Sequence, residues 1–253
     1  MDLQLKDKVA IVTGGSRGLG RAISAALGAE GVRVALNYRQ AGGRADAVAA
    51  EIEAAFGSRA IAVAADVADE QDVRRLFDRA EAELGPVDVL VNNAGVWPTA
   101  LVRDMSVSQW RRTIDVNLTG PFLTCREAVR RWLAVGRAGR IVNVSSQAAF
   151  RGSTTGHADY AASKAGLVSL TVSLAREVAP GGIAVNAVAP GMMETDMARD
   201  ALDHGRDEYL RRIPLGRIGD PAEIAAVVVF LASPAAGYMT GATVDVTGGM
   251  LMR

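Results

Sequence analysis

The chain has 253 residues, of which 49% are hydrophobic and 22% charged, and its formal net charge at pH 7 is zero. This length and composition are typical of one globular domain and argue against a disordered chain. Balanced charge without a long run of Lys or Arg argues against nucleic acid as a partner.

Short apolar runs alternate along the chain with longer helical patterns, which is typical of βαβ units that build a parallel sheet. Most of these runs are uninterrupted, as expected of strands that helices cover on both faces. We therefore predict an α/β fold with a doubly wound, seven-stranded parallel sheet and helices on both faces. The predicted strands are Val9–Val12, Val32–Leu36, Ile61–Ala64, Val87–Val91, Ile141–Val144, Ala184–Ala187 and Thr243–Val246.

Helical periodicity fills the stretches between the strands, and no internal repeat or linker divides the chain. The fourth helical stretch is expected to bend near Gly120 and Pro121, because proline removes a backbone hydrogen bond. Residues 191–213 fit no layer, and we interpret them as a mobile lid. The predicted helices are Ala22–Ala29, Ala45–Ala55, Glu70–Glu83, Ser108–Val135, Tyr160–Val178 and Ala222–Leu231.

Targeting and metal signals are missing from the sequence. The single cysteine, Cys125, cannot form an intrachain disulfide, and no Cys/His cluster has zinc-site spacing. Residues 1–8 contain no apolar signal segment. The apolar run Ile224–Ala232 is about half of the roughly 20 residues that a membrane span needs. We therefore expect a cytoplasmic protein without a bound metal or a membrane partner.

A glycine-rich loop joins the first predicted strand to the first predicted helix. Its pattern is Gly14-x₃-Gly18-x-Gly20. Glycines let the backbone approach a pyrophosphate, and a helix N-terminus offers N–H groups and a favourable dipole to an anion. The spacing differs from the common G-x-G-x-x-G, so this loop alone is weak support for a dinucleotide site.

Tyr160 and Lys164 are four residues apart and therefore share one face of their predicted helix. A free phenol has a pKa near ~10. A neighbouring ammonium favours the phenolate, which makes Tyr160 a candidate proton donor and acceptor. A serine at a strand end, Ser145 or Ser146, would supply a second hydrogen bond to a substrate oxygen.

The choice of cofactor depends on the residues that meet the adenosine ribose. An acid roughly 20 residues after the glycines would favour NAD by bonding the ribose 2′-hydroxyl. The chain instead has Asn37, Tyr38 and Arg39 at that position, and Arg17 lies in the glycine loop. Two guanidinium groups suit a 2′-phosphate, so NADP(H) is predicted. NAD(H) remains an alternative, because none of these residues repels it.

Five motifs occur in the order found in short-chain dehydrogenases/reductases, and the chain resembles that family over almost its whole length. They are Thr13–Gly20, Asn92–Gly95, Asn117, Tyr160–Lys164 and Pro190–Gly191. The resemblance implies a Rossmann-type fold and an oxidoreductase that moves hydride between a nicotinamide and a carbonyl or secondary alcohol. Within one domain, residues 1–95 would mainly bind the cofactor, and residues 96–253 would hold the catalytic groups and the substrate.

The resemblance also assigns roles to single residues. The catalytic set would be Asn117, Ser146, Tyr160 and Lys164, with Ser145 as a minor alternative to Ser146, and no chemistry is assigned to His157 or Asp159. The implied cofactor contacts are Gly14, Ser16, Arg17, Gly18, Leu19, Gly20, Asn37, Tyr38, Arg39, Asp66, Val67, Asn93, Ala94, Gly95, Tyr160, Lys164, Pro190, Gly191, Met193 and Thr195.

The sequence indicates the substrate and the partners of the protein less clearly than its reaction. The chain is most similar to the 3-oxoacyl-[acyl-carrier-protein] reductase branch, and Arg130, Arg131 and Arg137 are candidates for docking the carrier beside a pocket formed by Trp97, residues 147–157 and the lid. Residues 179–182 lack a cation expected in that branch, and Val246–Gly249 lacks its usual Asp-Gly-Gly. A small ketone, a sugar or alcohol dehydrogenase reaction, and a non-catalytic dinucleotide sensor remain alternatives. The family also implies a homotetramer.

Overall fold

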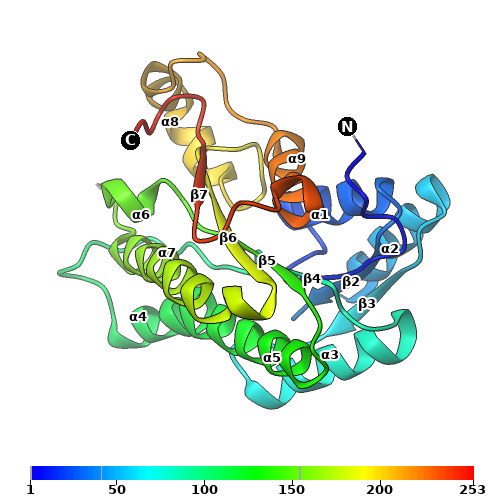
Figure 1. The fold of residues 1–253 in the computed structure, drawn as a ribbon. Helices are drawn as coiled ribbons and strands as arrows, with labels where there is room; N and C mark the ends of the chain where they lie inside the picture. Colours follow the sequence, from blue (N-terminus) through cyan, green and yellow to red (C-terminus); the bar gives the residue numbers. More distant parts are fainter. Residues whose placement is uncertain (1, 41, 154) are drawn as a thin grey trace.

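A computed structural model describes residues 2–40, 42–153 and 155–253, and within these residues the strands form one parallel sheet of seven. Their order in the sheet is β3-β2-β1-β4-β5-β6-β7, which confirms the predicted doubly wound fold (Figure 1). The strands are β1 (Val9–Val12), β2 (Arg33–Tyr38), β3 (Ala60–Ala64), β4 (Val89–Asn92), β5 (Gly139–Val144), β6 (Ile183–Pro190) and β7 (Thr243–Val246).

Helices cover both faces of this sheet (Figure 1). Apolar side chains of α1, α2 and α9 form one core with the strands, and those of α3, α5 and α7 form a second core on the other face. The helices are α1 (Gly18–Ala29), α2 (Gly42–Phe56), α3 (Glu70–Leu84), α4 (Val107–Ile114), α5 (Gly120–Ala134), α6 (Ala148–Arg151), α7 (Ala158–Val178), α8 (Arg199–Arg212) and α9 (Pro221–Ala232).

The site lies where the strand order reverses. β1 pairs with β2 on one side and with β4 on the other, so the connections leaving their carboxyl ends diverge. Such a divergence opens a crevice at the carboxyl edge of the sheet. The Thr13 N–H, just past β1, bonds the Val91 carbonyl at 3.0 Å and fixes the start of the glycine loop at that edge.

The sequence predicts a bend near Gly120 and Pro121, and the structure has an irregular helical turn directly before these residues. A π-helical turn, Asp115–Thr119, joins α4 to α5, and Pro121 is accommodated in the first turn of α5. A π turn adds a residue to the helical repeat, and such turns often occur at functional sites. Here it turns the buried side chain of Asn117 toward the loop after β4 and toward α7.

The segment predicted as a lid contains a helix that the sequence did not reveal. Residues 199–212 form α8, which departs from helical geometry at Gly205 and buries Leu202. Leu202, Ile213 and Met250 belong to a small apolar cluster apart from the two main cores. Among the described residues, no helix combines the length and the apolar character needed to cross a membrane.

Candidate active site

The glycine loop leaves the amino end of α1 open toward the crevice. Arg17, the N-cap residue, makes no side-chain bond to the first-turn amides. Gly14 and Gly18 have φ of +62° and +49°, a region that favours glycine. At Gly20 an added Cβ would stand 2.0 Å from the Gly14 carbonyl oxygen. The open amides and the closely packed backbone fit a bound pyrophosphate.

Buried polar side chains hold this loop against the neighbouring strands. The Thr13 hydroxyl accepts bonds from the Asn93 and Ala94 amides at 2.9 and 3.0 Å. The Asn93 side-chain amide donates to the Thr13 carbonyl at 2.9 Å. Asn37 donates to the Ala65 carbonyl at 3.0 Å, so its amide group supports the backbone rather than reaching out to a ligand.

Arginines surround the end of the crevice beyond β2. Arg39 and Arg112 approach the same carboxylate oxygen of Asp66, at 3.6 and 3.4 Å. Arg44 lies 3.7 Å from Asp196, and Arg17 lines the same cleft. One carboxylate shared by two guanidinium groups leaves net positive charge there, which suits a phosphate on the ribose.

All of the cofactor contacts implied by the resemblance line a single cleft. The sequence did not single out several further lining residues, which either carry no recognisable motif or lie in the segment predicted as a lid without being named individually. These are Gln40, Arg44, Ala65, Val96, Arg112, Val116, Val144, Asp196 and Met197.

The structure places Ser146, and not Ser145, against the tyrosine. Ser146 and Tyr160 line the same two cavities, and the Ser146 hydroxyl lowers the pKa of the phenol, whereas burial has the larger effect and raises it. Ser145 is turned away, because its hydroxyl donates to the Lys164 carbonyl at 3.1 Å. Tyr160 and Ser146 thus form a pair of hydroxyls at the carboxyl edge of the sheet.

Lys164 lies under the tyrosine ring and is almost completely buried. Its Nζ is 5.7 Å from the ring centroid of Tyr160 and donates to the Val144 carbonyl at 2.7 Å. Burial lowers the pKa of Lys164 to about 8. The sequence predicted that this ammonium lowers the Tyr160 pKa, but in the structure burial raises the pKa of Tyr160, because burial penalises the charged phenolate.

Asn117 has its whole side chain engaged. Its oxygen accepts from the Val96 amide at 2.9 Å, while its nitrogen donates to the Val96 carbonyl at 3.0 Å and to the Ser163 hydroxyl at 3.1 Å. Both Asn117 and Lys164 lie close to Gly95. The hydrogen bonds of Asn117 therefore hold the π turn, the loop after β4 and α7 together near Lys164.

An aromatic wall stands beside Tyr160. The His157 ring stacks on Trp97 with centroids 4.3 Å apart, and its Nδ1 lies 2.7 Å from the Pro98 carbonyl oxygen. Trp97 meets Tyr160 edge-on at 6.3 Å. Asp159 points into the protein, where Thr113 donates to it at 2.7 Å. His157 and Asp159, to which no chemistry was assigned, thus have structural contacts.

The three arginines proposed to dock a carrier do not lie beside this pocket. Arg131 pairs with Asp78, Glu81 and Glu127 at 2.6 to 2.7 Å. Arg137 pairs with Asp88, just before β4, at 2.7 Å. These contacts are at the amino edge of the sheet, whereas the site is at the carboxyl edge. Arg130 precedes Arg131 near the end of α5, so we withdraw this docking prediction.

Known proteins resemble this chain over its full length. A family model described as Enoyl-(Acyl carrier protein) reductase matches residues 14–251. A 3-oxoacyl-[acyl-carrier-protein] reductase of Synechocystis sp. is 45% identical over 249 residues and covers 98% of each chain. The structure of a short-chain type dehydrogenase/reductase from Mycobacterium marinum superposes with a TM-score of 0.95 at 35% identity, covering 100% of this chain and 99% of that one.

This chain belongs to the short-chain dehydrogenase/reductase family. A second curated relative, the 3-oxoacyl-[acyl-carrier-protein] reductase of Aquifex aeolicus, is 42% identical over 250 residues, covering 99% of this chain and 100% of the relative. A structure from Agrobacterium tumefaciens with bound NADP has a TM-score of 0.90 at 38% identity, covering 100% and 99% of the two chains. The protein is therefore an oxidoreductase, and the non-catalytic sensor is no longer needed as an alternative.

Proposed function

We propose that this short-chain dehydrogenase/reductase uses NADPH to reduce the 3-oxo group of an acyl thioester. The full-length likeness to 3-oxoacyl-[acyl-carrier-protein] reductases is the observation that carries the proposal. The hydroxyl pair of Ser146 and Tyr160 supports it, since two donors at one point suit a carbonyl oxygen that gains negative charge.

Bound NADPH would supply the hydride for the carbonyl carbon. Tyr160 would give its phenolic proton to the carbonyl oxygen, and Ser146 would hold that oxygen by a hydrogen bond. Burial raises the pKa of Tyr160, which keeps the phenol protonated and suits it to the reductive direction. Lys164 would stabilise the phenolate that remains after proton transfer, and Asn117 would keep Lys164 in place.

The arginines near the ribose end of the cleft support the choice of NADPH. The double variant Arg17→Ala and Arg39→Ala is expected to raise the KM for NADPH by roughly 10-fold or more while the KM for NADH changes little, because only NADPH carries the 2′-phosphate. Steady-state kinetics with each cofactor test this. Equal increases in the KM for NADPH and the KM for NADH would show that the arginines do not recognise the 2′-phosphate.

The rate of reduction is expected to fall as the pH rises through about 8. Burial lowers the pKa of Lys164 from 10.5 to about 8, so the ammonium is present below that pH and is lost above it. Tyr160 keeps its proton over the same range, because its pKa is raised. A pH profile of kcat/KM, with NADPH binding followed by fluorescence as control, tests this. A flat profile well past pH 9 would contradict the role given to Lys164.

A free alcohol or sugar is the second candidate substrate class. The NADP-bound Agrobacterium tumefaciens relative is provisionally named a 2-deoxy-d-gluconate 3-dehydrogenase. In addition, the arginines first proposed to dock a carrier protein pair with acids away from the pocket, so they provide no docking surface beside it. The deciding experiment compares NADPH-dependent turnover of a 3-oxoacyl thioester with NADP-dependent oxidation of sugars and secondary alcohols. The thioester should have the larger kcat/KM by at least about 10-fold; the reverse order would favour the second candidate.

A further inference from the structure

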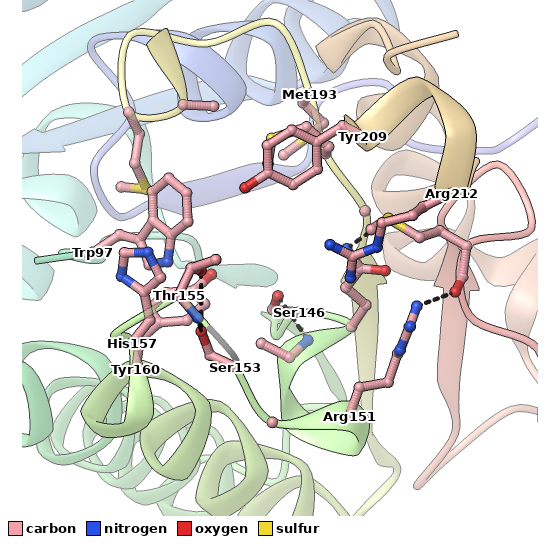
Figure 2. Close-up of a pocket in the computed structure, with 18 of the residues that line it drawn as sticks. Trp97, Ser146, Arg151, Ser153, Thr155, His157, Tyr160, Met193, Tyr209 and Arg212 are labelled. Carbon is pink, nitrogen blue, oxygen red and sulfur yellow. Dashed lines mark hydrogen bonds between the residues drawn. The ribbon is translucent and has the colours of Figure 1, made fainter. Parts of the chain in front are cut away.

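A second cavity opens from the catalytic groups and is distinct from most of the cofactor cleft. Ser146 and Tyr160 line both spaces, so a carbonyl held by them has the rest of its molecule in this cavity. The walls come from the loop after β5, from α6 and α8, and from the turn after β7 (Figures 1 and 2). The residues that line this cavity therefore influence which substrates can bind.

The two sides of the cavity differ in character. Trp97 and His157 form the aromatic side described above, and Figure 2 shows Arg151 and Arg212 across the cavity from them. Arg151 is the last residue of α6 and Arg212 the last residue of α8. Two guanidinium groups from separate elements thus face the same space as the reacting hydroxyls.

Neither arginine is firmly neutralised within the described residues. The described lining of the cavity contains no Asp or Glu. Arg151 donates to the Met250 carbonyl at 2.5 Å and has no ion-pair partner among the described residues. Arg212 forms a long ion pair of 3.8 Å with the exposed side chain of Glu208. By contrast, Arg206 on α8 is held by Glu194 at 2.6 Å. The cavity therefore has net positive charge.

Neighbouring polar groups add hydrogen-bonding capacity. The Gln147 side-chain oxygen is buried without a partner among the described residues, while its nitrogen contacts the Met250 sulfur at 3.2 Å. Ser153 and Thr155 also line the cavity. A guanidinium binds carboxylate or phosphate oxygens through paired N–H groups, and in a partly enclosed space that attraction is less screened than on an open surface.

We propose that Arg151 and Arg212 form a subsite for an anionic oxygen group of the substrate, a carboxylate or a phosphate, remote from the carbonyl that is reduced. This inference rests on the proposed function, because it takes the carbonyl to be held by Ser146 and Tyr160. It narrows the substrate to ketones that carry a negative charge at a distance from the reacting carbon.

The first test compares substrates that differ only in charge. A 3-oxoacyl N-acetylcysteamine thioester ending in a carboxylate should have a kcat/KM roughly 10-fold or more above that of its methyl ester. Arg212→Gln and Arg151→Gln should each remove most of this difference, and Arg151→Lys should restore part of it. Arg211→Gln is the matched control, because Arg211 neighbours Arg212 on α8 but does not line the cavity.

A second pair of substrates tests whether the bound anionic group is a carboxylate or a phosphate. Pantetheine thioesters with and without the phosphate are compared in the same way; a preference for the phosphorylated form that needs Arg151 and Arg212 would identify phosphate as the anion. Equal kcat/KM values within both pairs, or arginine variants that slow charged and uncharged substrates alike, would overturn the subsite.

A binding measurement keeps this inference separate from the proposed function. Calorimetric titration of the NADP-loaded protein with adipate and with its dimethyl ester needs no turnover. If no thioester is reduced but adipate binds and Arg212→Gln weakens its binding, the proposed function fails and the subsite stands. If thioesters are reduced without regard to charge and adipate binds no better than its ester, the subsite fails and the proposed function stands.

Discussion

Replacing Tyr160 by Phe is expected to lower kcat/KM for carbonyl reduction by about 10²- to 10⁴-fold, the range typical of a lost general acid. The variant loses only the phenolic oxygen and keeps the ring beside Trp97 and over Lys164. NADPH affinity should therefore change by no more than a few-fold. Steady-state kinetics and fluorescence titration with NADPH give the two quantities.

Tyr238→Phe is the matched control, because Tyr238 is fully exposed and does not line the catalytic cavities. It should leave kcat/KM and the melting temperature unchanged. If Tyr160→Phe kept more than about a tenth of the wild-type kcat/KM, a proton donor other than Tyr160 would have to serve the carbonyl, since general acid catalysis is worth more than that factor.

The second large effect is expected from Gly20→Ala. The added Cβ would stand 2.0 Å from the Gly14 carbonyl oxygen and 2.6 Å from the Asn93 amide nitrogen, so the glycine loop must move. Forced overpacking costs about 1–3 kcal/mol. If that strain is relieved by displacing the amides that face the pyrophosphate, NADPH binding should weaken by roughly 10- to 100-fold. Fluorescence titration measures the loss.

Gly43→Ala provides the control for Gly20→Ala. Gly43 lies in α2, and an added Cβ there meets nothing within 4 Å. Alanine should therefore stabilise the protein slightly, by about 0.5–1 kcal/mol, with unchanged NADPH affinity. Wild-type affinity in Gly20→Ala would mean that the loop around Gly20 does not hold the cofactor.

The sequence was sufficient to predict the sheet and its order of elements, because buried parallel strands appear as uninterrupted apolar runs. It did not predict α8, whose residues are mostly polar and bury only Leu202. Helices without an apolar face carry no periodic signal. The π turn was not predicted either: the sequence indicated only a bend near Gly120 and Pro121, and the hydrogen bonds of Asn117 to distant segments have no signal in the sequence.

Site residues on strand ends and on α7 were predictable because they follow recognisable elements at fixed spacing. Contacts between segments that are far apart in the sequence could not be predicted. Arg131 and Arg137 looked available in the sequence, yet acids on α3 and before β4 engage them. Arg151 and Arg212 are 61 positions apart by their numbering and meet only because α6 and α8 border one cavity. Likewise, burial decides the pKa direction of Tyr160, and burial is a property of the folded chain.

Direct transfer of hydride to the carbonyl carbon of a 3-oxoacyl thioester is the central claim, and isotope labelling measures it most directly. The enzyme is given NADPH deuterated at C4 of the nicotinamide, in each of the two stereochemical forms, and the product is analysed by mass spectrometry. One form should yield a 3-hydroxyacyl thioester with a single deuterium on the carbinol carbon. Product without deuterium from both forms, or no product at all, would contradict the account.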